Sequence, residues 1–322
     1  MIDEWSSTGV QVPKQIAVPP IVPLPMEEMA FLQLRNHDVA DSIDQDDDAS
    51  SNSSSLLAQM IILNRILSDV NALNNQRSVD VEIMPPDTDA VEALAARLDA
   101  WEMALPHFMR DNPSNLAHYA AQGLGRIYVA VYLGYYHFGQ LLFYQFLDGA
   151  RDDDSNDLVA SFARRCKWHA AQLCNMVYAA HETPGCDALY NMIGHCLVIA
   201  STVQIHTLLF SSDDDEIAAA RIRLERNFNT LLRLRELWPS LDFCMMRLQA
   251  FHKACRTSMD TSFKLDRWML KFLSEFAKPV DDKPSSADNW VIGDIAITPA
   301  SDFGIHSIQL QELMYGETHG ID

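Results

Sequence analysis

Two acidic clusters have residue types and spacing that could do chemistry. Residues 153–157 read Asp-Asp-Ser-Asn-Asp, an Asp-Asp-x-x-Asp pattern. Carboxylates at this spacing on a helix can hold magnesium ions against a diphosphate group. Residues 213–216, Asp-Asp-Asp-Glu, are the candidate for a second ligand set, but no hydroxyl residue stands where such a set needs one. Because the first cluster precedes a helix expected to begin at Leu158, we expect it in a loop and not in the wall of a cavity.

Class I terpene cyclases, which are all-α proteins of similar length, carry two such acidic motifs, and the first cluster resembles theirs. An all-α, magnesium-dependent terpene-cyclase-like enzyme is therefore the alternative interpretation. Diphosphate binding that needs magnesium and is lost in Asp153→Ala would favour it. The chain has no Gly-x-Ser-x-Gly, phosphate-loop or dinucleotide glycine pattern. We expect no enzyme, no catalytic residue, no metal site and no cofactor, and any cofactor-binding residue is left undefined.

Cysteine and histidine pairs could supply zinc ligands, namely Cys166 with His169 and the adjacent His195-Cys196. Isolated cysteines and histidines on apolar helices more often belong to a core. The six cysteines include no Cys-x2-Cys pair, which favours free, buried thiols in a reducing compartment. His137, which lies among tyrosines, is likewise predicted to be a core residue.

The charge balance argues against nucleic acid as a direct partner. The chain of 322 residues has a formal net charge of −20 and a pI near 4.8, so a phosphate backbone would be repelled. Five arginines fall on one expected helix together with Glu225 and Glu236. Arg221 and Glu225 are four residues apart, which predicts a solvated, paired face. The arginines are Arg221, Arg223, Arg226, Arg233 and Arg235.

Two uncharged runs, Ile127–Leu147 and Ala188–Ser212, are long enough to span a bilayer. Both contain histidine and glutamine, and helices that are apolar all round also occupy the centres of large bundles. We expect buried helices and no membrane partner. The N-terminus shows no basic region followed by an apolar core, so no signal peptide is expected.

Apolar periodicity and helix breakers predict an all-α, multi-helix bundle of about eight to nine helices without strands. Caps and prolines set the ends: serines precede the first helix, Asn112-Pro113 starts the third, and Asp213–Asp215 start another. The third helix is expected to bend near Gly123 and Gly125. The expected helices are Leu56–Arg77, Asp87 or Thr88–Trp101, Asn112–Phe146, Leu158–His181, Ala188–Phe210, Glu216–Leu237, and two more between Pro239 and Phe276.

The stretch Arg223–Phe276 carries a family resemblance. It looks like the end of the regulatory domain, or middle homology region, of fungal zinc-cluster transcription factors. The matching residues are Trp238, Pro239, Arg247, Leu248, Phe251, His252, Cys255, Ser262, Phe263, Leu265, Asp266, Trp268, Met269, Leu270, Phe272 and Leu273.

Upstream segments resemble the same family in the same order, so the resemblance covers roughly residues 24–277. Leu24–Phe31 matches a short Leu-Pro, acidic, Phe motif of that family. Further matches are Trp101, Leu105-Pro106, Asn115-Leu116, Tyr135-Tyr136-His137, Leu141-Leu142, Cys166, Ala170-Ala171 and the Met192–Thr207 helix.

The zinc cluster through which family members bind DNA has no counterpart here. Its six cysteines begin with a Cys-x2-Cys pair, whereas the six cysteines here are spread from Cys166 to Cys255 without a basic segment. DNA binding is therefore not carried over from the family. The sequence leaves open whether the absence of the zinc cluster is biological or the result of truncation.

The expected organisation has three parts: a Pro-rich then acidic flexible segment at 1–55, an all-α regulatory domain at 56–277, and an acidic-hydrophobic tail at 278–322. The tail resembles activation segments that fold on a partner, or it is a plain surface tail with one docking helix. The resemblance implies a nuclear transcription regulator, expected to be an activator, that acts through protein partners such as the transcription machinery. A homo- or heterodimer, a small-molecule effector and a scaffold-only truncated paralogue stay open, and target genes cannot be named.

Overall fold

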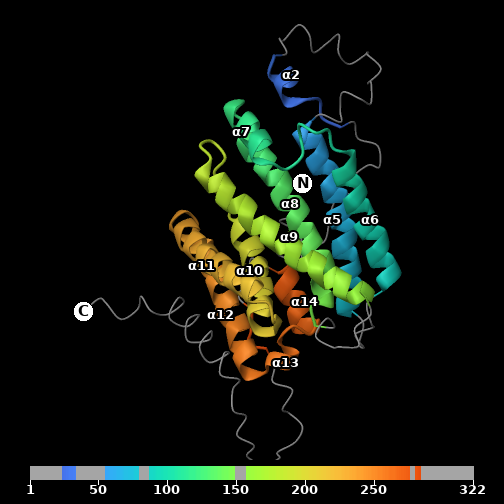
Figure 1. Ribbon diagram of the computed structural model, residues 1–322, viewed down its shortest axis with the longest axis vertical. Coiled ribbons are helices and arrows are strands. Elements are labelled where there is room, and N and C mark those ends of the chain that lie inside the picture. Colours follow the sequence, from blue (N-terminus) through green and yellow to red (C-terminus); the bar gives the residue numbers. More distant parts are fainter. Residues whose placement is uncertain (1–23, 34–54, 80–86, 149–156, 276–279, 284–322) are drawn as a thin grey trace, which may run out of the picture. The chain divides into compact units, whose positions relative to one another are not determined.

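The computed structural model describes residues 24–33, 55–79, 87–148, 157–275 and 280–283 (Figure 1). In these ranges the protein is all-α without strands, and nine helices are seven residues or longer. The predicted fold class is therefore confirmed. Most of the segments expected to be flexible, 1–55 and 278–322, lie outside the described residues.

The chain divides into two compact units. Unit 1 comprises residues 1–142 and 175–188, and unit 2 comprises residues 143–174 and 189–322. The helix Asp157–Glu182 contributes its first part to unit 2 and its end to unit 1.

Unit 1 is built mainly from four helices and a short N-terminal one. In order they are α2 (Glu28–Gln33), α5 (Leu56–Val79), α6 (Thr88–Ala104), α7 (Pro113–Ala121) and α8 (Gly125–Phe143). Helices α5 and α6 lie side by side (Figure 1), and Arg97 of α6 forms an ion pair of 2.6 Å with Asp69 of α5. The core includes Leu63, Val70 and Leu98, which are almost entirely buried.

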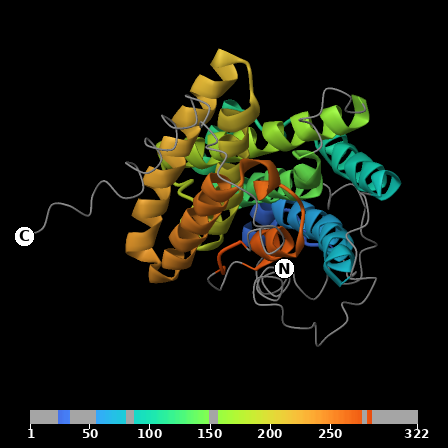
Figure 2. The same ribbon diagram turned by 90° about the horizontal axis from the view of Figure 1, so that it is seen from below.

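Unit 2 contains the later helices. They are the first part of α9 (Asp157–Glu182), then α10 (Met192–Phe210), α11 (Asp214–Leu237), α12 (Asp242–Thr257), α13 (Met259–Ser262) and α14 (Arg267–Ser274), with short 3-10 turns at Tyr144–Phe146 and Pro239–Leu241. Helix α10 packs against α11 and α12, and α11 and α12 run side by side (Figure 2). Trp238 and Pro239 separate α11 from α12, as the proline predicts.

Four helices begin at the caps that the sequence predicts. Ser55, Asp87 and Asn112 each accept a hydrogen bond of 2.8–3.0 Å from the backbone N–H three residues on. Asp213 accepts two such bonds at the start of α11, from the second and third residues that follow it. Side-chain oxygens at these positions satisfy donors that the first helical turn leaves unpaired. The acidic residues 213–216 therefore serve helix initiation.

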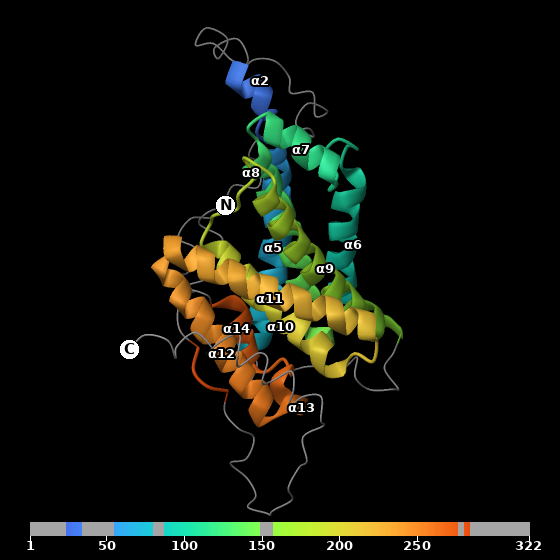
Figure 3. The ribbon, with the colours of Figure 1, turned by 60° about the vertical axis from the view of Figure 1, so that its left-hand side comes forward.

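The expected single helix from Asn112 to Phe146 is wrong, because the chain breaks between α7 and α8. Gly123 has φ +77°, in the left-handed region that glycine adopts most easily. The Gly123 N–H donates to Ala120 O and the Leu124 N–H donates to Tyr119 O, which is the Schellman pattern of a helix end. The two helices consequently take different directions (Figure 3).

Two other helix limits differ from the expected ones. Helix α10 starts at Met192 and not at Ala188. The last expected helix, with Leu265 as its first apolar residue, starts as α14 at Arg267, because Asp266 caps it by accepting from the Met269 N–H at 2.8 Å, and the short α13 precedes it. At α14 a polar cap thus sets a limit that apolar periodicity alone does not place.

Two helical stretches are long and apolar enough to cross a membrane by length and composition alone, Leu56–Asn74 and Met192–Phe210. In α10, 89% of the apolar window is buried within the protein, against 39% in α5. The burial of α10 agrees with the expected core helix in the run Ala188–Ser212. The other uncharged run, Ile127–Leu147, is divided between α8 and the 3-10 turn.

Gly125→Ala is expected to lower the free energy of unfolding by about 1–3 kcal/mol, because the added methyl group overpacks a rigid site. The new Cβ would collide with Cys186 Sγ and would lie 3.1 Å from Ala120 Cα and 3.2 Å from Gly185 O. Backbone atoms cannot move aside as a flexible side chain can. Urea unfolding followed by circular dichroism measures the change.

Gly134→Ala is the matched control on the same helix. Its Cβ would meet Phe138 at 3.6 Å, an ordinary contact, and alanine stabilises a helix relative to glycine by roughly 0.5–1 kcal/mol. If alanine lowers the free energy of unfolding as much at position 134 as at position 125, the steric explanation is refuted.

Candidate functional site

The residues considered for zinc lie in buried surroundings. Cys166 and His169 lie on α9 and are almost fully buried, as are His195 and Cys196 on α10. Burial raises the pKa of the Cys166 thiol and lowers the pKa of His169 to about 3, so that both groups are neutral at pH 7. No group of three or more His, Cys, Asp or Glu residues that could hold a metal occurs in the described part of the chain.

All six cysteines are free and buried, as predicted. His137 is also buried, as expected, and its Nδ1 lies 2.8 Å from Gln140 Nε2. Burial lowers the pKa of His137 to about 3. A ring that stays neutral and bonded to an amide is suited to a core.

Only part of the acidic cluster at 153–157 lies among the described residues, so its relation to residues 213–216 stays untested. Residues 153–156 lie outside the described ranges, and Asp157 is the first residue of α9. The Arg221–Arg235 arginines lie at the surface of α11, where Arg235 pairs with Asp242 at 2.6 Å. The exposure of these arginines agrees with the predicted solvated face, whereas the predicted pair of Arg221 with Glu225 stays a prediction.

Tyrosine side chains on α8 donate hydrogen bonds to the segment that connects α6 to α7. Tyr128 donates to Arg110 O at 2.7 Å, and Tyr132 donates to Met109 O at 2.6 Å. Burial raises the pKa of both hydroxyl groups, so they remain protonated donors throughout the physiological range. Tyr136 makes a third such contact.

The third tyrosine contact places a carboxyl group at the rim of a cleft, here called the Asp111 cleft. Tyr136 donates to Asp111 Oδ2 at 2.5 Å. The cleft has a volume of about 340 Å³, and its wall includes Asn112, Asn175 and Glu182. Partial burial raises the pKa of Asp111, although the hydrogen bond from Tyr136 acts in the opposite direction.

Asp111→Asn is expected to raise the free energy of unfolding at pH 7 by up to about 1 kcal/mol, allowing for screening by solvent. A carboxyl group whose folded pKa is raised stabilises the protein below its ordinary pKa of 3.8 and loses that contribution as the pH rises through the folded value. The gain in the variant should therefore shrink on acidification and vanish below that ordinary pKa. Urea unfolding at a series of pH values measures it.

Glu92→Gln, on the exposed face of α6, is the matched control for the loss of one negative charge. Suppose that Asp111→Asn raises the free energy of unfolding no more than Glu92→Gln does, or that its gain grows as the pH falls. Either result would contradict the raised pKa of Asp111.

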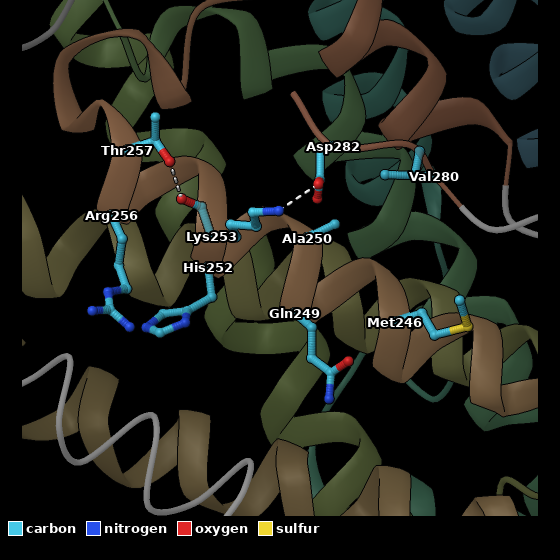
Figure 4. A pocket seen from close by; sticks show the side chains of 9 residues that line it. All are labelled: Met246, Gln249, Ala250, His252, Lys253, Arg256, Thr257, Val280 and Asp282. Atoms are coloured by element: carbon cyan, nitrogen blue, oxygen red, sulfur yellow. Dashed lines mark hydrogen bonds and ion pairs between the residues drawn. The ribbon is translucent and has the colours of Figure 1, made fainter. Parts of the chain in front are cut away.

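The second hollow lies along α12 and has a volume of about 690 Å³. Figure 4 shows the side chains that line it, which come from α12 and from residues 280–283. We call it the α12 hollow, and its wall includes Met246, Ala250, Lys253, Arg256, Val280 and Asp282. His252 also lines it. Burial, followed by the nearby charge of Arg256, lowers the pKa of His252.

Residues 280–283, here called the strap, are held by a buried lysine. Lys283 Nζ donates to Thr261 O at 2.8 Å and pairs with Asp266 Oδ2 at 2.9 Å. Its side chain is only 8% exposed and its ammonium group lies 5.2 Å from the centre of the Trp268 ring. Trp268 Nε1 in turn donates to Asp281 O at 2.6 Å. These contacts fix the strap on unit 2.

The strap brings a carboxylate onto the positive part of the α12 hollow. Asp282 forms an ion pair with Lys253, and both side chains are largely exposed (Figure 4). The positive charge of the hollow is thus partly compensated by the chain itself.

Sequence analysis did not single out the lining of either hollow. Lys253 and Arg256 are three residues apart and flank the apolar stripe of α12, so a basic edge was visible in the sequence. The buried position of Lys283 was not visible in the sequence, because the oxygen atoms that it binds come from another segment of the chain. Asp111 likewise gives no local signal, since its raised pKa results from tertiary burial.

Comparison of the chain with protein-family models, with curated proteins and with solved structures finds no match. The function is therefore inferred from the residues and their geometry.

Proposed function

We propose that this chain is a transcription regulator of the kind whose regulatory domain is found in fungal zinc-cluster transcription factors. It acts in the nucleus by binding protein partners or a small effector and not by catalysis. The observation that carries the proposal is that most of the matching residues between Arg223 and Phe276 are buried together in unit 2. The buried members are Arg247, Leu248, Phe251, His252, Cys255, Ser262, Phe263, Leu265, Trp268, Met269, Leu270, Phe272 and Leu273.

The packing of these residues explains why their types matter. The Phe251 ring lies 5.2 Å from Phe263 and 5.4 Å from Phe272, and Trp268 stacks on Phe272 at 5.3 Å. Such aromatic pairs contribute about 0.5–1.5 kcal/mol beyond the burial of their surface. Arg247 is fully buried beside them. The matching residues thus depend on one another across α12, α13 and α14, which a chance set of apolar residues need not do.

The upstream Leu-Pro, acidic, Phe motif also has defined contacts. Glu27 accepts from the Met29 and Ala30 N–H groups and so caps α2. Glu28 accepts from the Leu56 and Leu57 N–H groups and so caps α5. Both acidic residues of the motif therefore stabilise helix starts, and this supports reading the motif as part of the folded domain.

The charge of the chain supports protein partners over nucleic acid. A net charge of −20 repels a phosphate backbone. A factor of this kind would reach DNA through a separate basic segment or through a partner that binds DNA.

A reporter assay tests the proposal. The whole chain, fused to a foreign DNA-binding domain, is expected to change transcription of a reporter gene relative to the DNA-binding domain alone. Immunoblotting and fractionation of nuclei check that the fusion is present where it must act. A fusion that is present in nuclei but leaves the reporter unchanged would contradict a regulatory output.

A further inference from the structure

The α12 hollow has the size and the lining of a small-molecule site. Its volume of about 690 Å³ falls within the roughly 300–1,000 Å³ that is typical of ligand pockets. Met246 and Arg256 are ten residues apart on α12, which corresponds to about 15 Å along the helix axis. The hollow is therefore elongated along α12.

The two ends of the hollow differ in chemistry. Lys253 supplies a positive charge where it reaches Asp282, and Met246 and Val280 supply apolar surface towards one end of the hollow. The Arg256 side chain also lines the hollow but points away from the Lys253–Asp282 pair. The His252 ring, whose pKa is lowered by burial, adds a neutral polar wall. An occupant that satisfies both ends has an anionic head and an apolar body.

The strap already provides one of the two chemical groups of such an occupant, a carboxylate, within the hollow. This carboxylate belongs to Asp282 and forms an ion pair with Lys253. Because both partners of this ion pair are largely exposed, the pair is weak and can be exchanged. Lys283 holds the strap through contacts of its own, so Asp282 can give up Lys253 without the strap leaving unit 2.

We propose that the α12 hollow binds an amphiphilic organic anion, a carboxylate or phosphate group on an aliphatic body, with Lys253 holding the head and Met246 and Val280 contacting the body. Asp282 is an internal competitor for Lys253. The inference deepens the proposed function by giving the effector a chemical class. It is tested on the purified whole chain, so that it and the reporter assay can fail separately.

Isothermal titration calorimetry with octanoate, octyl phosphate and inorganic phosphate, each below its micellar concentration, tests the proposal. Both octyl compounds are expected to bind at least about tenfold more tightly than inorganic phosphate, because burial of the alkyl chain adds affinity. A preference for one octyl compound identifies the head group. Equal binding of inorganic phosphate and octyl phosphate, or no binding of either octyl compound, would overturn the proposal.

Three variants locate the binding. Lys253→Met should weaken octyl-compound binding about tenfold or more, whereas Lys271→Met, which changes an exposed lysine outside the hollow, should leave it unchanged. Asp282→Asn should strengthen binding about two- to fivefold by freeing Lys253. Circular dichroism checks that each variant is folded. Equal losses in the two lysine variants, or weaker binding in Asp282→Asn, would exclude the α12 hollow as the site.

Discussion

Arg247→Ala is expected to lower the free energy of unfolding by about 3–5 kcal/mol, whereas Arg247→Met should cost less than about 1.5 kcal/mol. Arg247 is fully buried, donates to Phe272 O and places its guanidinium 4.7 Å from the centre of the Phe272 ring. Alanine leaves a cavity as well as an unpaired carbonyl group. Methionine fills most of the space and can contact the Phe272 ring through its sulfur.

The buried charge explains why we expect methionine to be tolerated at position 247. Burial lowers the pKa of Arg247 to about 10, which means that desolvation outweighs the nearby groups that favour the charged form. Its Nε and Nη1 atoms have no hydrogen-bond partner among the described residues. Replacement of such a charge by an apolar side chain of similar size is often neutral.

Urea unfolding followed by circular dichroism at 222 nm measures both Arg247 variants. Arg267→Ala, at an exposed arginine of α14, controls for the loss of an arginine that is not buried. Equal costs of alanine and methionine at position 247 would show that the charge itself and not the packing holds α12 to α14.

Glu28→Ala is expected to lower the free energy of unfolding by about 1.5–3 kcal/mol. Glu28 is 7% exposed, and its carboxylate accepts from Ser55 Oγ at 2.8 Å, from the Leu56 N–H at 3.1 Å and from the Leu57 N–H at 2.8 Å. Without it, the start of α5 loses three hydrogen bonds and a negative charge that suits the helix dipole. Hydrogen exchange should speed up in residues 24–33 and 55–60.

Glu92→Ala, which changes an exposed glutamate of α6, is the matched control for Glu28→Ala. Its expected effect is within about 0.5 kcal/mol. Unchanged exchange rates at the start of α5 in Glu28→Ala would contradict a capping role and would leave the acidic motif without a structural explanation.

Local signals predicted much of the fold. Asn112 followed by Pro113 gave the start of α7, and Trp238-Pro239 gave the end of α11, because caps and prolines act through their immediate neighbours. The break at Gly123 was expected as a bend, since periodicity cannot distinguish a bent helix from a left-handed glycine that ends it.

The candidate sites were less predictable than the helices, because they depend on contacts between distant segments. The strap meets α12 and α14 through Lys283 and Asp282, which lie in a segment without helical periodicity. The buried state of Arg247 was equally hidden, since an arginine in a helix is usually exposed. The family resemblance marked Arg247 as a matching residue but gave no physical reason for it.

The most direct test of the regulatory role compares three fusions to a foreign DNA-binding domain: the whole chain, residues 1–283 and residues 1–277. The second keeps the strap and removes residues 284–322 of the acidic-hydrophobic tail, while the third removes the whole tail with the strap. We predict reporter activation by the whole chain and its loss in both shortened fusions, because we propose that the acidic-hydrophobic tail carries the output. Activation by residues 1–283 equal to that of the whole chain would contradict a role of the tail, and reporter levels equal to those of the DNA-binding domain alone in all three would contradict the regulator itself.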